Sequence, residues 1–98
     1  MNRKTKVLQQ LEEHRDEIRR FGVRRLALFG STARGEQGER SDLDFLVEFE
    51  KKSFDAYMDL KNYLEELFNC RVDLVLPNTI KPRLKNRILS ETVDVPGL

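Results

Sequence analysis

The chain has 98 residues, of which 39% are hydrophobic and 36% charged, and its formal net charge is +1. This length fits one small domain, 1–98, and excludes a free-standing enzyme of two domains, while the near-zero charge gives no reason to expect nucleic acid as a direct partner. The single cysteine, Cys70, permits neither an internal disulfide nor a cysteine metal site. No apolar run reaches the ~20 residues of a membrane span, and no signal-peptide core is present. We therefore expect a cytoplasmic protein with no membrane contact.

The first half of the chain predicts a helix followed by a strand. Apolar residues recur at helical spacing over residues 5–21, and Gly22 supplies a stop. His14 lies near this stripe, and we interpret it as a boundary residue rather than a catalytic base. Residues 23–29 read as a strand that is continuously apolar at its end and therefore buried there.

The second half of the chain predicts two more strands and two helices. The strands are 42–49 and 71–76. The helix 54–68 begins after a capping serine, Ser53, and ends at Asn69, a residue that tolerates the left-handed conformation. A basic helix over 82–90 has Pro82 in its first turn and Leu84, Ile88 and Leu89 facing inward. The tail 91–98 carries no pattern that predicts structure.

A turn and a pair of acids stand out between the first two strands. Gly30-Ser31 ends the first strand and opens a short helix, 31–34, which Gly35 ends. Free N–H groups at such a turn suit a phosphate, although a strand-to-helix turn with a serine N-cap would have the same sequence. After a polar loop over 36–40, Asp42 and Asp44 point to one face of the next strand and can share hard cations. A solvated strand end would explain one of these acids more easily than both.

Asp73 is a third acid, inside the apolar strand 71–76. A carboxylate there is costly unless it is exposed or neutralised. A salt bridge to Arg71, two residues away on the same face, is the structural alternative to a role in a metal site. Strands that meet one ligand at Gly30 and at Asp42 are antiparallel if they are neighbours, and a right-handed crossover through a helix sets the third strand parallel to the second. We therefore expect an α/β (α+β) fold, a small mixed β-sheet with flanking helices, with the acids at one sheet edge.

The residues LFGSTARGEQGERSDLDFLV carry a family resemblance. Gly30-Ser31, ten residues, then Asp42-x-Asp44 resembles the signature of the DNA polymerase beta-like nucleotidyltransferases. The form GSTARG-x(5)-SDLD is similar to that of the minimal nucleotidyltransferases, which are found beside HEPN-domain proteins in toxin–antitoxin pairs. The resemblance covers residues 23–76 and implies the nucleotidyltransferase core fold. It also implies that Asp42, Asp44 and Asp73 bind two Mg²⁺ ions, with Asp73 taking the hydroxyl proton.

The resemblance further implies a nucleotide site and a partner. Gly30 and Ser31 would hold the phosphates of ATP, and Arg34 is a candidate to bind them through its planar guanidinium group. The implied activity is transfer of AMP from ATP to a hydroxyl of a HEPN ribonuclease toxin, with tyrosine as the expected acceptor, so that this chain acts as the antitoxin. A non-catalytic binding antitoxin and nucleotidyl transfer to a small molecule are the alternatives. The sequence is compatible with a homodimer and with a hetero-oligomer that includes the toxin.

Overall fold

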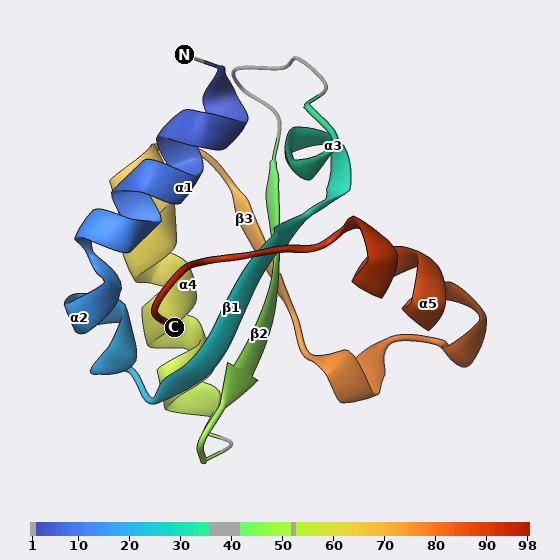
Figure 1. Ribbon diagram of the computed structural model, residues 1–98. Coiled ribbons are helices and arrows are strands. Elements are labelled where there is room, and N and C mark those ends of the chain that lie inside the picture. Colours follow the sequence, from blue (N-terminus) through green and yellow to red (C-terminus); the bar gives the residue numbers. More distant parts are fainter. Residues whose placement is uncertain (1, 36–41, 52) are drawn as a thin grey trace.

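The computed structural model describes residues 2–35, 42–51 and 53–98 (Figure 1). The helices and strands follow the chain in this order: α1 (Arg3–Glu13), α2 (Arg15–Arg19), β1 (Val23–Phe29), α3 (Gly30–Ala33), β2 (Leu43–Phe49), α4 (Phe54–Phe68), β3 (Val72–Val75), the 3₁₀ turn η1 (Pro77–Thr79), α5 (Pro82–Glu91) and β4 (Val93–Asp94). Residues 36–41, which include the whole predicted polar loop 36–40, lie outside the described residues.

The described strands form one mixed sheet in the order β3-β2-β1-β4. β1 pairs with β2 antiparallel, and Phe29 lies opposite Asp44. β3 pairs with β2 in parallel, and Asp73 lies opposite Asp44. The predicted α/β class and both predicted strand pairings are therefore confirmed. This register brings the end of β1 and the starts of β2 and β3 to one end of the sheet.

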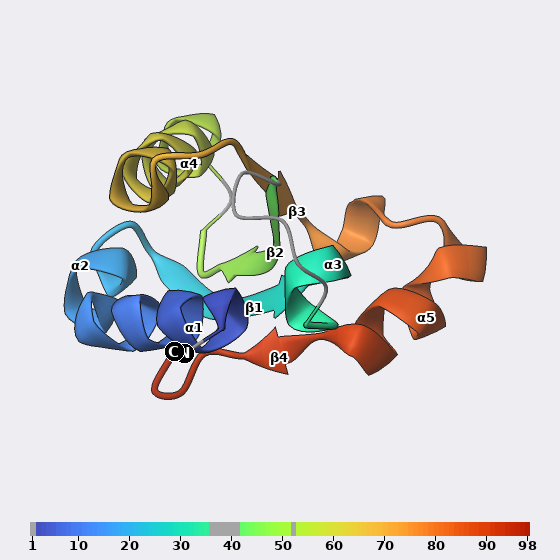
Figure 2. The ribbon, with the colours of Figure 1, turned by 90° about the horizontal axis from the view of Figure 1, so that it is seen from above.

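One face of the sheet carries the main core. Helices α1, α2 and α4 lie on this side in both ribbon views (Figures 1 and 2). Alternate residues of β2 point into this layer, and Leu43, Phe45 and Val47 have no exposed surface. They pack with Leu11 and Leu64 of the helices in a single cluster. This is the face that the apolar residues of β2 predicted.

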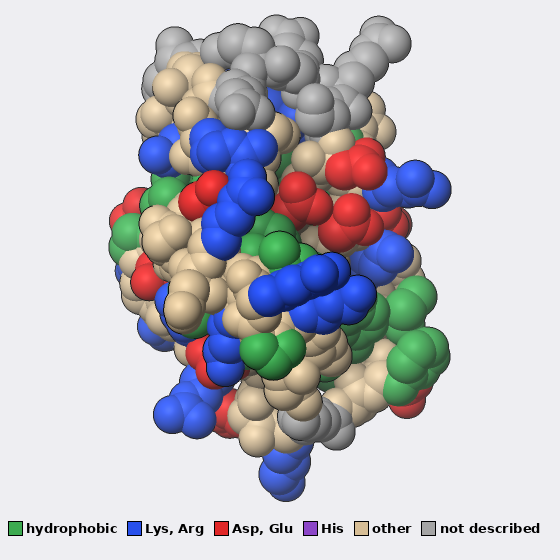
Figure 3. Space-filling view, turned by 90° about the vertical axis from the view of Figure 1, so that its right-hand side faces the viewer, with side chains coloured by type: hydrophobic (Ala, Val, Ile, Leu, Met, Phe, Trp, Pro, Cys, Tyr) green, Lys and Arg blue, Asp and Glu red, His purple; other side chains and the backbone are tan. Residues whose placement is uncertain are grey.

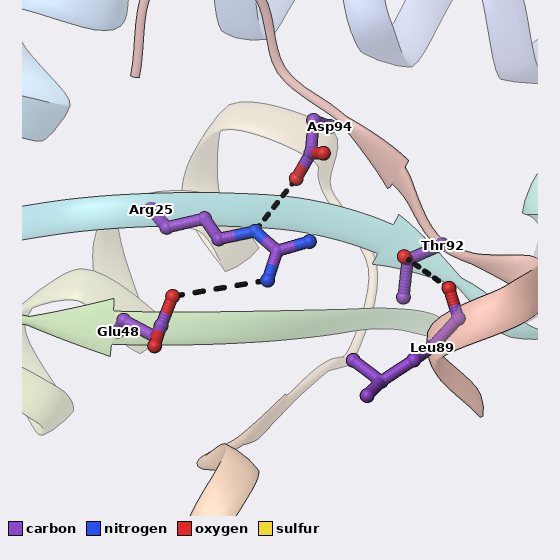
Figure 4. A network of polar contacts seen from close by, with 5 residues as sticks. All are labelled: Arg25, Glu48, Leu89, Thr92 and Asp94. Carbon is purple, nitrogen blue, oxygen red and sulfur yellow. Dashed lines mark hydrogen bonds and ion pairs between the residues drawn. The ribbon is translucent and has the colours of Figure 1, made fainter. Parts of the chain in front are cut away.

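Helix α5 lies on the opposite side of the sheet from α1 and α4 (Figure 2). Ala27 and Leu46 are register partners on this face and are also buried. Arg25 lies farther along the same face, where its Nε donates to Asp94 Oδ1 at 2.8 Å and its Nη1 lies 3.8 Å from Glu48 Oε2 (Figure 4). The pair with Asp94 joins β4 to β1.

The predicted helix 5–21 is in fact two helices, because the backbone turns away from helical geometry at His14 (φ −106°, ψ 15°). The His14 ring shares a 2.8 Å hydrogen bond with the carbonyl of Gln10, a local contact that competes with helix continuation. The ring also packs edge-on against Tyr63 of α4, with centroids 6.5 Å apart. His14 is thus a packing residue at the boundary of the core, and it lies outside the acidic end of the sheet.

The C-terminal part of the chain contains one strand without a sequence signal and one helix residue that departs from its prediction. The tail, for which no structure was predicted, contributes the edge strand β4 and the buried side chain of Val95, whose N–H donates to Leu26 O. Leu84 was expected to face inward but is 40% exposed, because only the end of α5 reaches the sheet.

The α4 prediction is confirmed in full: Ser53 accepts from Ala56 N, and Asn69 is left-handed (φ 51°). Among the described residues, no helix has the length and apolar character needed to cross a membrane.

Candidate active site

The three predicted acids come together at the α3 end of the sheet. Asp44 lies on the central strand β2, with Asp73 of β3 as its register partner. Asp42 directly precedes β2 and is exposed. Figure 3 shows acidic side chains gathered on the face of the molecule that carries α5, next to Lys and Arg side chains. The third acid is thus where the parallel pairing of β2 and β3 was expected to place it.

Asp44 is the electrostatic centre of this cluster. Its partial burial raises the pKa of the carboxyl group, and the negative charges of Asp73 and Asp42 raise that pKa further. A side-chain hydrogen bond with Asp73 acts in the same direction, whereas the positive charge of Arg34 lowers the pKa. Two carboxyl groups can hydrogen-bond only if one holds a proton. A cation that replaces this proton would therefore relieve the repulsion.

The donor set fits a hard divalent cation. All three side chains offer carboxylate oxygens, the ligands that Mg²⁺ takes in proteins. Within the described residues, however, no three His, Cys, Asp or Glu side chains converge closely enough to enclose a metal ion. The register places Asp73 beside Asp44, and Asp42 directly precedes β2, so the acids are gathered at one end of the sheet but not closed around one point.

Gly30 touches the acidic cluster directly. Its φ is +78°, a conformation that side-chain-bearing residues rarely adopt. A Cβ added at this position would lie 2.4 Å from Asp44 Oδ2, much closer than atoms can approach. The resemblance implied that Gly30 helps to hold the phosphates of ATP. In the structure, the backbone makes a close approach to the carboxylate of Asp44.

Ser31 is the second residue of α3, so it is not the N-cap that the structural alternative required. The N-cap position is Phe29, and it makes no side-chain cap. Phe29 holds this position because β1 runs directly into α3 at Gly30. The alternative that explained Ser31 as a helix cap thus loses its support, and Ser31 remains partly exposed beside the acidic end of the sheet.

Arg34 follows α3, and the sequence analysis missed its partner on α5. Arg34 Nη1 donates to Glu91 Oε2 at 3.0 Å, and the charge of Arg34 also acts on Asp44. The guanidinium group therefore lies within electrostatic reach of the acidic cluster. The only sequence signal for Glu91 was that it is the one acid in the segment 82–91.

The structural alternatives for two other residues can now be assessed. Among the described residues, no ion pair joins Arg71 to Asp73, and Asp73 is exposed. Exposure removes the cost of a buried charge and leaves this carboxylate accessible. Cys70 is partly buried, and Arg3 Nη2 lies 3.4 Å from its sulfur. Burial raises the pKa of the Cys70 thiol, which does not favour a nucleophile.

Known proteins share the sequence pattern and the fold of this chain. The profile of the Nucleotidyltransferase domain family matches residues 11–95. Protein adenylyltransferase MntA of Thermococcus cleftensis is 45% identical over 87 residues, which cover 87% of this chain and 88% of MntA. A solved structure assigned as a minimal nucleotidyltransferase superposes with a TM-score of 0.72 at 38% identity, covering 95% of each chain.

A more distant likeness concerns the fold. The structure of an AMPylated HEPN toxin of Shewanella oneidensis in complex with its MNT antitoxin matches with a TM-score of 0.64 at 20% identity. The match covers 93% of this chain and 73% of that one. From the match over residues 11–95 and the 38% identity to a minimal nucleotidyltransferase, this chain belongs to the nucleotidyltransferase domain family, in its minimal branch.

Proposed function

We propose that this chain transfers AMP from ATP to a hydroxyl group of a partner HEPN toxin and thereby acts as its antitoxin. The observation that carries the proposal is the placement of Asp44, which has Asp73 and Asp42 beside it and the Gly30 backbone against its carboxylate. The resemblance to a protein adenylyltransferase at 45% identity supports the chemistry. The match to an antitoxin bound to an AMPylated HEPN toxin supports the choice of partner.

The residues divide the chemical work among them. Asp42 and Asp44 would hold two Mg²⁺ ions between them, and Asp73 would hold one of these. When bound, Mg²⁺ lowers the pKa of the attacking hydroxyl and neutralises charge on the triphosphate. Ser31 and the N–H groups after Gly30 would bind the β- and γ-phosphates. Arg34 would bind phosphate oxygens through its planar guanidinium group.

The transfer then proceeds as an in-line substitution at the α-phosphorus. The acceptor oxygen bonds to the α-phosphorus while the bond to the oxygen that bridges to the β-phosphorus breaks, and pyrophosphate leaves. Asp73 is exposed and can accept the proton that the hydroxyl group loses. A tyrosine is the expected acceptor, because a phenol with a pKa of ~10 ionises more easily than an aliphatic alcohol.

A protein acceptor suits the small size of this site. In the described part of the chain there is no second domain that would enclose a sugar or another small acceptor. A folded partner brings its own binding surface and can exclude water from the activated phosphate. AMP added to a tyrosine also introduces a bulky negative group, which would repel RNA phosphate from the nuclease site.

Intact mass spectrometry of the partner toxin tests this proposal. After incubation with the chain and Mg-ATP, the toxin should gain the mass of one or more AMP groups, and Asp44→Asn should abolish the gain. A parallel incubation with each of the other nucleoside triphosphates measures base preference.

A non-catalytic antitoxin is the second candidate. It is favoured by one observation: among the described residues, the acids do not converge on a metal-sized point. It predicts that the toxin's nuclease is neutralised while its mass stays unchanged, and that Asp44→Asn neutralises as well as the parent chain. That result would defeat the transferase proposal.

A further inference from the structure

Glu91 is the last residue of α5, and its carboxylate contacts two arginines. Oε2 accepts from Arg34 Nη1 at 3.0 Å, and Oε1 lies 3.7 Å from Arg87 Nε. The side chain of Glu91 is 25% exposed, whereas that of Arg87, its neighbour on α5, is 74% exposed. The closer and better-shielded contact is therefore the one that reaches across to the residue after α3.

The position of this acid is unfavourable for α5 itself. The C-terminal end of a helix carries partial negative charge, so an acidic residue there is destabilising and a basic one is preferred. The last turn of α5 contains no basic residue. Within α5 this carboxylate has the i,i+4 pair with Arg87, which is exposed and therefore weak, whereas the contact with Arg34 is closer and better shielded.

Arg34 lies between this carboxylate and the acidic cluster. Its Nη1 is held by Glu91, while its positive charge lowers the pKa of Asp44. Helices α3 and α5 are in direct contact, which fixes the distance between the two ends of the ion pair. Glu91 thus sets where the guanidinium group stands relative to Asp44.

We infer that Glu91 is a positioning residue, which holds the Arg34 guanidinium group in place to receive the phosphates of the nucleotide. The inference rests on the phosphate-binding role proposed above for Arg34. Arginine has a long, flexible side chain that loses rotamer freedom when it binds a ligand. A carboxylate that already restricts this freedom reduces the loss, and nucleotide binding becomes tighter.

A double-mutant cycle measured by equilibrium binding tests this role. Four chains are compared: the parent, Glu91→Ala, Arg34→Ala and the double variant, each titrated with Mg²⁺ and α,β-methylene-ATP, an analogue from which AMP cannot be transferred. We expect Glu91→Ala to raise the Kd about tenfold in the parent background, and less than about twofold where Arg34 is already alanine. Glu91→Gln, which keeps the shape but removes the charge, should fall between parent and Glu91→Ala.

A matched control is available on the same face of the sheet. Asp94→Ala removes another carboxylate–arginine pair, Arg25–Asp94, which lies outside the acidic cluster. It should leave the Kd within about twofold of the parent. Melting curves of all variants show whether each chain is folded.

The results separate this role from the proposed function. If Glu91→Ala weakened nucleotide binding equally in the parent and in the Arg34→Ala background, Glu91 would not act through Arg34. That result would overturn the inference. Tighter binding by Glu91→Ala would overturn it as well, because Glu91 would then be competing with phosphate for Arg34. Since the cycle uses binding alone, a chain that binds nucleotide but transfers no AMP would defeat only the proposed transferase activity.

Discussion

The two faces of β2 differ in what their side chains do. Leu43, Phe45 and Val47 point to the helix layer and are completely buried. Asp44 and Glu48 alternate with them and point to the α5 side, where both are partly exposed. The strand thus provides much of the core with one face and the candidate active site with the other. Stability and chemistry should therefore be separable by substituting adjacent residues, and the following four predictions test this.

The largest effect on stability is expected for Phe45→Ala. Phe45 is fully buried and stacks on Phe68 of α4, with ring centroids 6.3 Å apart. Truncation of a buried phenylalanine costs about 3–5 kcal/mol in the free energy of unfolding, a large part of the ~5–15 kcal/mol of a typical domain. Urea denaturation measures the loss. The adjacent Asp44→Asn should not lower the free energy of unfolding at neutral pH; if it cost as much as Phe45→Ala, the two faces would not be separable.

Gly30→Ala comes next. A positive φ costs an L-residue roughly 1–2 kcal/mol, and here the new methyl group must also displace the Asp44 carboxylate. Gly35→Ala is the matched control, because Gly35 has the same φ of +78° but, among the described residues, has no atom within 4 Å of an added Cβ. We expect Gly30→Ala to be the more destabilising of the two in urea, and the only one to weaken Mg²⁺ binding. If the two substitutions had equal effects on stability and on Mg²⁺ binding, the contact between Gly30 and Asp44 would not be important for either.

The third prediction concerns pH. The folded state raises the pKa of Asp44 above its usual value of 3.8, so the folded chain holds this proton more tightly than the unfolded chain. The stabilising contribution is complete below pH 3.8 and is lost as the pH rises through the raised pKa. Without metal, Asp44→Asn should therefore melt at a higher temperature than the parent at neutral pH, and the gap should shrink on acidification.

Two further measurements check that prediction. Mg²⁺ at neutral pH should raise the melting temperature of the parent more than that of Asp44→Asn, because only the parent keeps the full set of charges. Asp59→Asn, at an exposed position on α4, serves as the control and should follow the parent at every pH. A melting temperature for Asp44→Asn below that of the parent at pH 7 would contradict the prediction.

The smallest effect is expected for Asp94→Asn. This residue pairs with Arg25 at 2.8 Å, but its side chain is 61% exposed. Exposed ion pairs contribute up to about 1 kcal/mol, and this one lies away from the acidic cluster. Urea denaturation should show a loss within that limit, and Mg²⁺ binding should be unchanged. A larger loss would mean that the edge strand β4 depends on this one pair.

Much of the fold could be predicted because local pattern and chain connectivity determine it. The alternation in β2 indicated which face is buried, and Ser53 and Asn69 marked both ends of α4. The three acids were expected together because β2 and β3 are parallel and each carries its acid near its start. These features follow from spacing along the chain, which a single sequence contains.

The features that could not be predicted depend on contacts between distant residues. β4 has two residues and no pattern of its own, and it forms because Asp94 pairs with Ala27 on β1. Glu91 is distinctive only once α3 and α5 are packed together. The break at His14 was missed because residues 5–21 are amphipathic throughout, and the His14 ring meets Tyr63 of α4 only in the folded chain.

The contact between Gly30 and Asp44 also constrains how this sequence can change over time. An added atom at position 30 would have to be matched by a shorter acid at position 44. Aspartate is already the shortest carboxylic side chain among the twenty amino acids, so no single substitution at position 44 can restore both the space and the charge. The residues at positions 30 and 44 therefore constrain each other. A descendant sequence that loses Gly30 also loses the present position of the Asp44 carboxylate.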